Sequence, residues 1–162
     1  MKVIYHNRTP LTLGRERPLG AQWVERDTLL AESDYLSVHV PLTPETHHLI
    51  GPEELNMMKP GAFLINTSRG PVVDETALLE ALRAGRIAGA GLDVYENEPV
   101  LTPGLTELDN VVLLPHVGSA TVATRRRMAA MAVDNLLAGL EGRTPPNWVN
   151  ADLIQEPKNF AE

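Results

Sequence analysis

Residues 62–94 read AFLINTSRGPVVDETALLEALRAGRIAGAGLDV, and this stretch determines the fold class. Its first residues, Ala62–Asn66, form an apolar run that predicts a buried strand. Asp74 suits a helix N-cap, apolar residues follow at helical spacing, and Gly85 ends the helix. Small and apolar residues return at Ile87–Val94, which predicts a second strand. A strand, a helix and a strand in this order form a βαβ unit, whose two strands must run parallel.

The same alternation extends in both directions along the chain. Several strands are apolar at nearly every position, which is typical of strands covered on both faces. The sequence therefore predicts an α/β fold with a doubly wound parallel sheet of the Rossmann type. The other expected strands and helices are Lys2–Tyr5, Asp27–Ser33 with Asp27 as its N-cap, Tyr35–Val40, two helix starts at Thr43-Pro44 and Gly51-Pro52, Asn110–Leu114, and Thr121–Leu140.

Length and composition restrict the function classes. The chain has 162 residues, 43% of them apolar, no cysteine and a net charge of −7. Disulfides and zinc–thiolate sites are excluded, and the acidic balance disfavours a nucleic-acid surface. No apolar run is long enough to span a bilayer, so no membrane partner and a cytoplasmic location are expected. His47 and His48 are adjacent on a turn, and we expect no metal site. Residues 1–142 are expected to form the folded domain and residues 143–162 a Pro-rich tail.

The candidate functional residues follow the predicted strands, because ligands of parallel sheets bind at the carboxyl ends of the strands. Arg69 follows the strand at 62–66, and its planar cationic fork suits a small carboxylate, although solvated loop arginines are common. Asp93 and Glu98 follow the next strand, where a polar loop with incidental acids is the alternative. His116 lies after Pro115 and suits proton transfer, although a lone histidine is more often structural.

Together these positions describe a chemical site. A cation, an acid and a histidine at three strand ends would surround a small anion and move a proton. A glutamate beside the histidine would stabilise its protonated form. The residues alone leave the reaction open.

The stretch NTSRGPVVDETALLEALRAGRIAGAGLDVYENEP, followed by LLPHVGSAT, closely resembles the D-isomer-specific 2-hydroxyacid dehydrogenases, and the resemblance extends from about Lys2 to Asn150. It implies that Arg69 grips the carboxylate and carbonyl of a 2-oxo acid. It implies that His116 is the general acid and Glu98 its partner. The opening VIYHNRTP and the closing PPNWVN look most like glyoxylate/hydroxypyruvate reductases, which interconvert 2-oxo acids and D-2-hydroxy acids and are expected to be homodimers at full length.

The resemblance also implies a nicotinamide cofactor. The segment His6–Thr9 contains no acid to bind a ribose 2′-hydroxyl, whereas Arg8, helped by Arg15 or Arg17, can pair with a 2′-phosphate. NADP(H) is therefore favoured, with NAD(H) as the alternative. The residues expected to line the cofactor are Asn7, Arg8, Thr9, Val40, Pro41, Thr67, Ser68, Arg69, Asp93, His116, Gly118 and Ser119.

One family feature is missing. The Gly-x-Gly-x-x-Gly turn that holds the pyrophosphate does not occur, so the chain is expected to be N-terminally truncated and to begin at the family's second cofactor-domain strand. Strands Lys2–Tyr5 and Ala62–Ile65 would then lose their shared neighbour and expose apolar edges. We expect an isolated chain to be unstable or to self-associate, with little or no turnover. A non-catalytic cofactor-binding or co-repressor-like scaffold is the alternative function.

Overall fold

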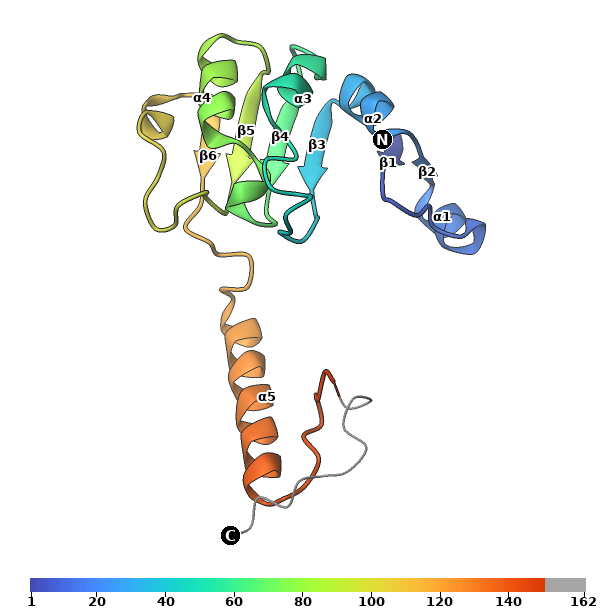
Figure 1. The fold of residues 1–162 in the computed structure, drawn as a ribbon, viewed down its shortest axis with the longest axis vertical. Helices are drawn as coiled ribbons and strands as arrows, with labels where there is room; N and C mark the ends of the chain where they lie inside the picture. Colours follow the sequence, from blue (N-terminus) through green and yellow to red (C-terminus); the bar gives the residue numbers. More distant parts are fainter. Residues whose placement is uncertain (151–162) are drawn as a thin grey trace. The chain divides into compact units, whose positions relative to one another are not determined.

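The computed structural model describes residues 1–150, which fall into two compact units, one of Met1–His116 and one beginning at Val117. The order of strands and helices is that of an α/β protein (Figure 1). In the first unit they are β1 (Val3–Tyr5), α1 (Leu13–Leu19), β2 (Ala21–Trp23), α2 (Arg26–Glu32), β3 (Tyr35–Val38), α3 (Pro52–Met57), β4 (Phe63–Asn66), the 3-10 turn η1 (Gly70–Val72), α4 (Glu75–Arg83), β5 (Gly89–Leu92), the 3-10 turn η2 (Leu105–Glu107) and β6 (Val111–Leu113).

A four-stranded sheet forms the centre of the first unit. Its order is β3-β4-β5-β6 and every pair is parallel, with Leu36 opposite Leu64 and Leu64 opposite Ala90. The predicted parallel α/β architecture is therefore confirmed. Because all four strands run the same way, the loops after β4, β5 and β6 leave the sheet at one edge.

Helices α3 and α4 cover one face of this sheet (Figure 1). Asp74 caps α4 as predicted, since its Oδ1 accepts a hydrogen bond from the Ala77 N–H at 2.9 Å. Leu64 and Leu78 are fully buried between sheet and helix. On the other face Tyr35 is 67% and Phe63 37% exposed, and their rings stack at 5.4 Å. The sequence predicted that both faces of the sheet are covered. Within residues 1–116, helices cover one of the two faces.

Strand β1 does not join the four-stranded sheet. It pairs in parallel with β2 in a separate two-stranded sheet, with Ile4 opposite Gln22. Neither β2 nor α1 was predicted, because Ala21–Trp23 has no apolar run and α1 contains Pro18 and has no buried residue.

The expected free edge at Ala62–Ile65 is wrong. Strand β4 is paired on both sides, by β3 and by β5, and it is β3 whose second edge has no strand beside it among residues 1–150. The physical reason is that Tyr35–Val38, the strand that follows α2, pairs with β4. The two strands that would lie on either side of a missing neighbour are therefore β1 and β3.

Two predicted helix starts also need correction. Helix α2 begins one residue earlier than expected, with Glu25 as its N-cap and Asp27 in its first turn. Thr43-Pro44 starts a hydrogen-bonded turn instead of a helix. There the Thr46 hydroxyl donates to the Pro41 carbonyl at 2.6 Å, and the Thr43 N–H donates to the Thr46 hydroxyl. These side-chain bonds close the turn locally and compete with a helix.

The second unit contains the long helix α5 (Val122–Leu140), capped by Thr121, whose hydroxyl accepts from the Thr124 N–H. Of the expected tail 143–162, residues 143–150 are irregular and the rest lies outside the described residues. None of the described helices is long and apolar enough to cross a membrane. The large exposed apolar side chains of α5 are Val122, Met128, Met131, Val133, Leu136, Leu137 and Leu140.

Candidate active site

The loop after β4 is shaped by the side chain of Asn66, which is 1% exposed. Its Oδ1 accepts hydrogen bonds from the Ser68 N–H at 3.0 Å and the Ser68 hydroxyl at 2.9 Å. Its Nδ2 donates to the Arg69 carbonyl at 3.0 Å. One buried amide thus fixes the backbone from Thr67 to Arg69 at the carboxyl end of the sheet.

Arg69 extends from this loop into solvent. Its side chain is exposed, and Nη1 donates to the Ser68 carbonyl at 2.6 Å. The next residue, Gly70, lies directly under the loop after β5, since a Cβ there would sit 1.8 Å from the Tyr95 carbonyl oxygen. The position of Arg69 is therefore coupled to the loop that carries Glu98.

The loop after β5 folds onto the end of β6. The Tyr95 hydroxyl donates to the Leu114 carbonyl at 2.7 Å, and burial raises the pKa of this phenol above its ordinary value, with Asp93 adding to the rise. Asp93 is itself buried at 5% exposure, and its N–H donates to the Asn66 carbonyl. These bonds hold the loops after β4, β5 and β6 together.

Glu98 and His116 form the central pair of the site. His116 Nδ1 lies 2.9 Å from Glu98 Oε2, and the side chains are 53% and 36% exposed. The His116 hydrogen bond, followed by one from the Tyr95 N–H, holds the pKa of Glu98 below its ordinary value. His116 has a positive φ of 53°, which is uncommon for a residue with a side chain and is typical of functional sites.

A pocket of about 350 Å³ opens beside the pair. Its walls combine apolar side chains with the two titratable groups, as in many small-molecule sites. The residues that line it are Tyr95, Glu98, Pro99, Leu101, Leu113, Leu114, Pro115 and His116.

The other residues predicted to line a cofactor lie in several places. Thr67 is exposed and Ser68 half-buried in the β4 loop, while Val40 packs on the core and Pro41 is exposed after β3. Asn7, Arg8 and Thr9 are exposed after β1. Gly118 and Ser119 belong to the second unit, so their part in this site stays a prediction.

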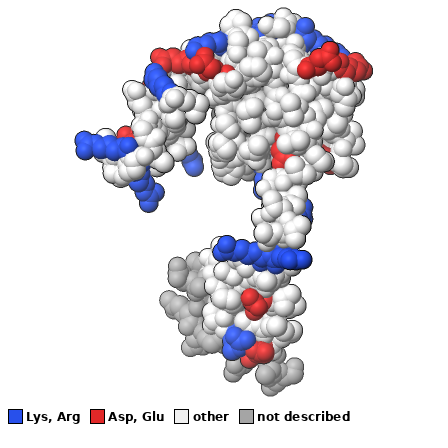
Figure 2. All heavy atoms as spheres, turned by 180° about the vertical axis from the view of Figure 1, so that it is seen from behind, with Lys and Arg blue, Asp and Glu red and all other residues white. Residues whose placement is uncertain are grey.

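Arg8 has an acidic neighbour that the sequence did not reveal. The pKa of Glu45 lies below its ordinary value, mainly because the Thr43 side chain donates a hydrogen bond to it, and Arg8 adds a smaller electrostatic contribution. The segments after β1 and β3 therefore lie near enough for their charges to interact. On the face shown in Figure 2, basic and acidic side chains both occur near the upper edge of the first unit, and most of the face below them is uncharged.

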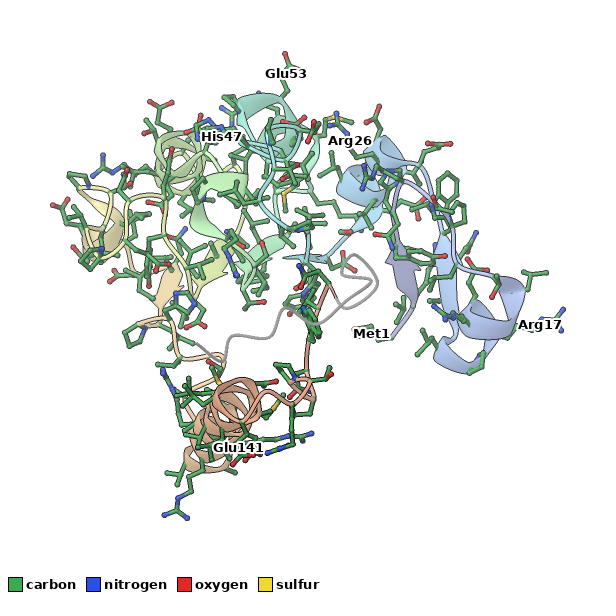
Figure 3. All side chains as sticks on the ribbon, turned by 60° about the horizontal axis from the view of Figure 1, so that its bottom comes forward. Met1, Arg17, Arg26, His47, Glu53 and Glu141 are labelled. Atoms are coloured by element: carbon green, nitrogen blue, oxygen red, sulfur yellow. The ribbon has the colours of Figure 1, made fainter. Side chains whose placement is uncertain are left out.

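His47 is labelled in Figure 3, and its ring lies close to the ring of its neighbour His48. Their ring centroids are 4.0 Å apart, and the ligand atoms of both rings and Glu96 lie within 4.8 Å. However, His48 Nε2 and Glu96 Oε1 are 2.7 Å apart, a direct hydrogen bond. Two ligands of one tetrahedral zinc would be separated by roughly 3.3 Å, given zinc–nitrogen bonds of about 2.0 Å. The geometry therefore favours a hydrogen bond between His48 and Glu96, and the expectation of no metal stays a prediction.

Sequence reasoning missed four polar residues that support the site. Asn66 was taken only as the end of a strand, and its Asx-type bonds to the next residues are a recognisable signal for such a loop. Glu75, Glu96 and His48 meet across separations of 21 and 48 positions. No local pattern indicates those contacts.

Comparison with known proteins agrees with this geometry. Residues 1–118 match the family described as "D-isomer specific 2-hydroxyacid dehydrogenase, NAD binding domain". The chain is 54% identical over 154 residues to a glyoxylate reductase of Thermococcus litoralis, which covers 95% of this chain and 46% of the relative. It is 53% identical over 156 residues to glyoxylate/hydroxypyruvate reductase B of Pectobacterium carotovorum, covering 96% of this chain and 48% of that protein.

Solved structures give the same result. The chain is 53% identical to the TT0316 protein from Thermus thermophilus, with a TM-score of 0.83 over 92% of this chain and 46% of that one. An NADPH-dependent glyoxylate/hydroxypyruvate reductase from Sinorhizobium meliloti, solved with NADP and malonate, is 43% identical, with a TM-score of 0.78 over 86% of this chain and 42% of that one.

The chain spans about half the length of the curated relatives it matches. The family match covers the parallel sheet together with Arg69, Glu98 and His116, the residues whose surroundings carried the resemblance. With more than half of its residues inside this match, the chain belongs to the D-isomer-specific 2-hydroxyacid dehydrogenase family.

Proposed function

We propose that the chain carries the proton-transfer and anion-binding part of an oxidoreductase site that interconverts 2-oxo acids and D-2-hydroxy acids. Glyoxylate and hydroxypyruvate are the proposed substrates, because relatives about half identical to the chain bear those names. The observation that carries the proposal is the 2.9 Å contact between His116 and Glu98 beside a pocket of suitable size.

Each residue has a chemical role in carbonyl reduction. A bound nicotinamide supplies the hydride that reaches the carbonyl carbon. His116 donates a proton to the carbonyl oxygen, and in the oxidative direction it takes the proton from the hydroxyl. Glu98 forms a hydrogen bond with Nδ1, which orients the ring and stabilises positive charge on it. Because Glu98 occupies Nδ1, the other ring nitrogen, Nε2, is the one that exchanges the proton with substrate.

Arg69 is proposed to bind the substrate carboxylate. Its guanidinium can donate two parallel hydrogen bonds to a carboxylate and place positive charge near the developing oxyanion. Among the described residues, the only hydrogen-bond partner of its side chain is the Ser68 carbonyl, a neutral group that an incoming carboxylate can replace.

The chain fits a nicotinamide cofactor at two places. The fixed loop Thr67–Arg69 and the buried Asp93 form the edge where a nicotinamide ring would lie, and Arg8 is available for a 2′-phosphate. NADP(H) is therefore proposed over NAD(H). A homodimer is proposed as the working assembly, and no nucleic-acid or membrane partner is proposed. The sequence provides no glycine-rich turn for the pyrophosphate.

The test is reduction of glyoxylate and hydroxypyruvate with NADPH, followed by the loss of nicotinamide absorbance and, for hydroxypyruvate, by chiral analysis of the glycerate formed, since the glycolate formed from glyoxylate is achiral. It should be run on the 162-residue chain and on a chimera in which the unmatched part of the Thermococcus litoralis relative is added to it. We expect the chimera to form the D-isomer and the chain alone to turn over slowly or not at all.

His116→Gln in the chimera is the matched control, since it removes the acid and keeps a polar side chain of similar size. A folded chimera that binds NADPH but reduces neither acid would overturn the proposal and favour a non-catalytic cofactor-binding protein.

A further inference from the structure

Glu75 is a buried acid that the proposed chemistry does not use. It lies in the first turn of α4 and is 2% exposed. A buried carboxylate is destabilising unless its oxygens are hydrogen-bonded. The partners of those oxygens therefore show what the residue does.

Both oxygens bind the loop that carries Glu98. Oε1 accepts from the Glu96 N–H at 2.6 Å, and Oε2 accepts from the Thr102 hydroxyl at 2.6 Å. The two donors lie on either side of Glu98 in the chain. One side chain thus fixes the loop before and after the residue that pairs with His116.

The attachment at Glu96 acts directly on the backbone of Glu98's own turn. Tyr95 and Glu96 present successive N–H groups, and each is bound by a carboxylate: Tyr95 by Glu98 at 3.0 Å, Glu96 by Glu75. If the second bond is lost, the peptide unit between the two residues is no longer held in place. The backbone dihedral angles at Tyr95 and Glu96, where the turn that carries Glu98 begins, can then change.

The side chain of Glu96 also binds Glu75 in return, and it binds His48. Glu96 Oε2 accepts from the Glu75 N–H at 3.4 Å, and Glu96 Oε1 bonds His48 Nε2 at 2.7 Å. His48 has a positive φ of 52°, and its N–H donates to the Pro71 carbonyl at 2.8 Å. Glu75, Glu96 and His48 therefore connect the turn after β3, the start of α4 and the loop after β5.

We propose that Glu75 is a positioning residue of the proposed oxidoreductase site: by binding the Glu96 N–H and the Thr102 hydroxyl it orients Glu98 toward His116. The inference rests on the proposed function for its catalytic meaning. The geometric claim, that Glu75 maintains the Glu98–His116 contact, is tested without substrate or cofactor.

The test is Glu75→Leu in the 162-residue chain, followed by NMR. A leucine side chain has a similar size but no acceptor, so both bonds are lost. We expect the Glu96 amide proton to lose its hydrogen-exchange protection. We expect the pH midpoint of the Glu98 carboxyl titration to rise toward the ordinary glutamate value, because the His116 hydrogen bond that lowers the pKa of Glu98 no longer forms. Asp93 is the other acid acting on the pair.

Glu80→Leu is the matched control, since Glu80 is an exposed acid of the same helix, and it should change neither signal. A folded Glu75→Leu chain with an unchanged Glu98 midpoint would contradict the proposal. If that variant does not fold, Thr102→Val, which removes one of the two bonds, decides: an unchanged midpoint again rejects the positioning role. Lack of turnover by the unmodified chain would count against the proposed function alone, because the titration needs no reaction.

Discussion

His116 Nδ1 and Glu98 Oε2 are joined by a 2.9 Å hydrogen bond between the ends of two neighbouring parallel strands. The bond is supported on the Glu98 side by the Tyr95 N–H and on the His116 side by the Tyr95 hydroxyl, which binds the Leu114 carbonyl. Tyr95 thus braces both partners.

Removing the general acid, His116, should slow the reaction strongly while leaving the fold intact. In the chimera, His116→Gln should lower kcat by about 100-fold to 10,000-fold, the usual contribution of general acid–base catalysis. Glu98→Gln should lower it less, because the histidine remains. Initial rates with glyoxylate and NADPH measure both variants, and equal kcat values for His116→Gln and the parent would refute the assignment.

The pH dependence follows from the lowered pKa of Glu98. Because its folded pKa is depressed, its stabilising contact with His116 is fully present above the ordinary glutamate value of 4.5 and is lost as pH falls through the folded value. Where the Glu98–His116 pair sets the acid limit, we expect activity to persist to below about pH 4.5. Profiles of kcat/KM against pH test this limit.

Cofactor choice should depend on Arg8. Arg8→Asp should weaken NADPH binding by roughly 10-fold to 100-fold, the value of a hydrogen bond to a charged group, and should improve NADH binding. Glu45→Gln should strengthen NADPH binding slightly, since Glu45 is the acid that interacts with Arg8. Arg86→Asp, before β5 at the amino ends of the strands, is the control. Titration calorimetry with both cofactors gives the comparison, and unchanged NADPH affinity in Arg8→Asp would reject the phosphate role.

Gly70 should not tolerate a side chain. A Cβ at this position would lie 1.8 Å from the Tyr95 carbonyl oxygen, a backbone atom that cannot move without displacing the loop that carries Glu98. Gly70→Ala is expected to reduce the free energy of unfolding by about 2 to 3 kcal/mol, the range of overpacked cores. Gly61→Ala, where a Cβ meets nothing within 4 Å, should stay within about 0.5 kcal/mol. Urea unfolding followed by circular dichroism gives both values.

Self-association should involve the open side of β3. Its free edge and the exposed stacked rings of Tyr35 and Phe63 favour contact between chains. Sedimentation velocity at rising concentration should show association that Tyr35→Lys reduces. A monomer at all concentrations would contradict this expectation.

Features encoded by local sequence were predictable. The Asp74 cap, the parallel strands and the placement of Arg69 and Glu98 after successive strands all follow from neighbouring residues. The free edge was assigned to the wrong strand, since which strand lies beside β4 depends on the whole sheet. The role of Glu75 was also hidden, because its partners Glu96 and Thr102 come 21 and 27 positions later.

The loop held by Asn66 has a thermodynamic consequence. Because the buried amide fixes Thr67–Arg69 before any ligand is present, binding there need not order the backbone. Ordering of that kind would cost about 1 to 2 kcal/mol per residue, so the loop is preorganised for its ligand.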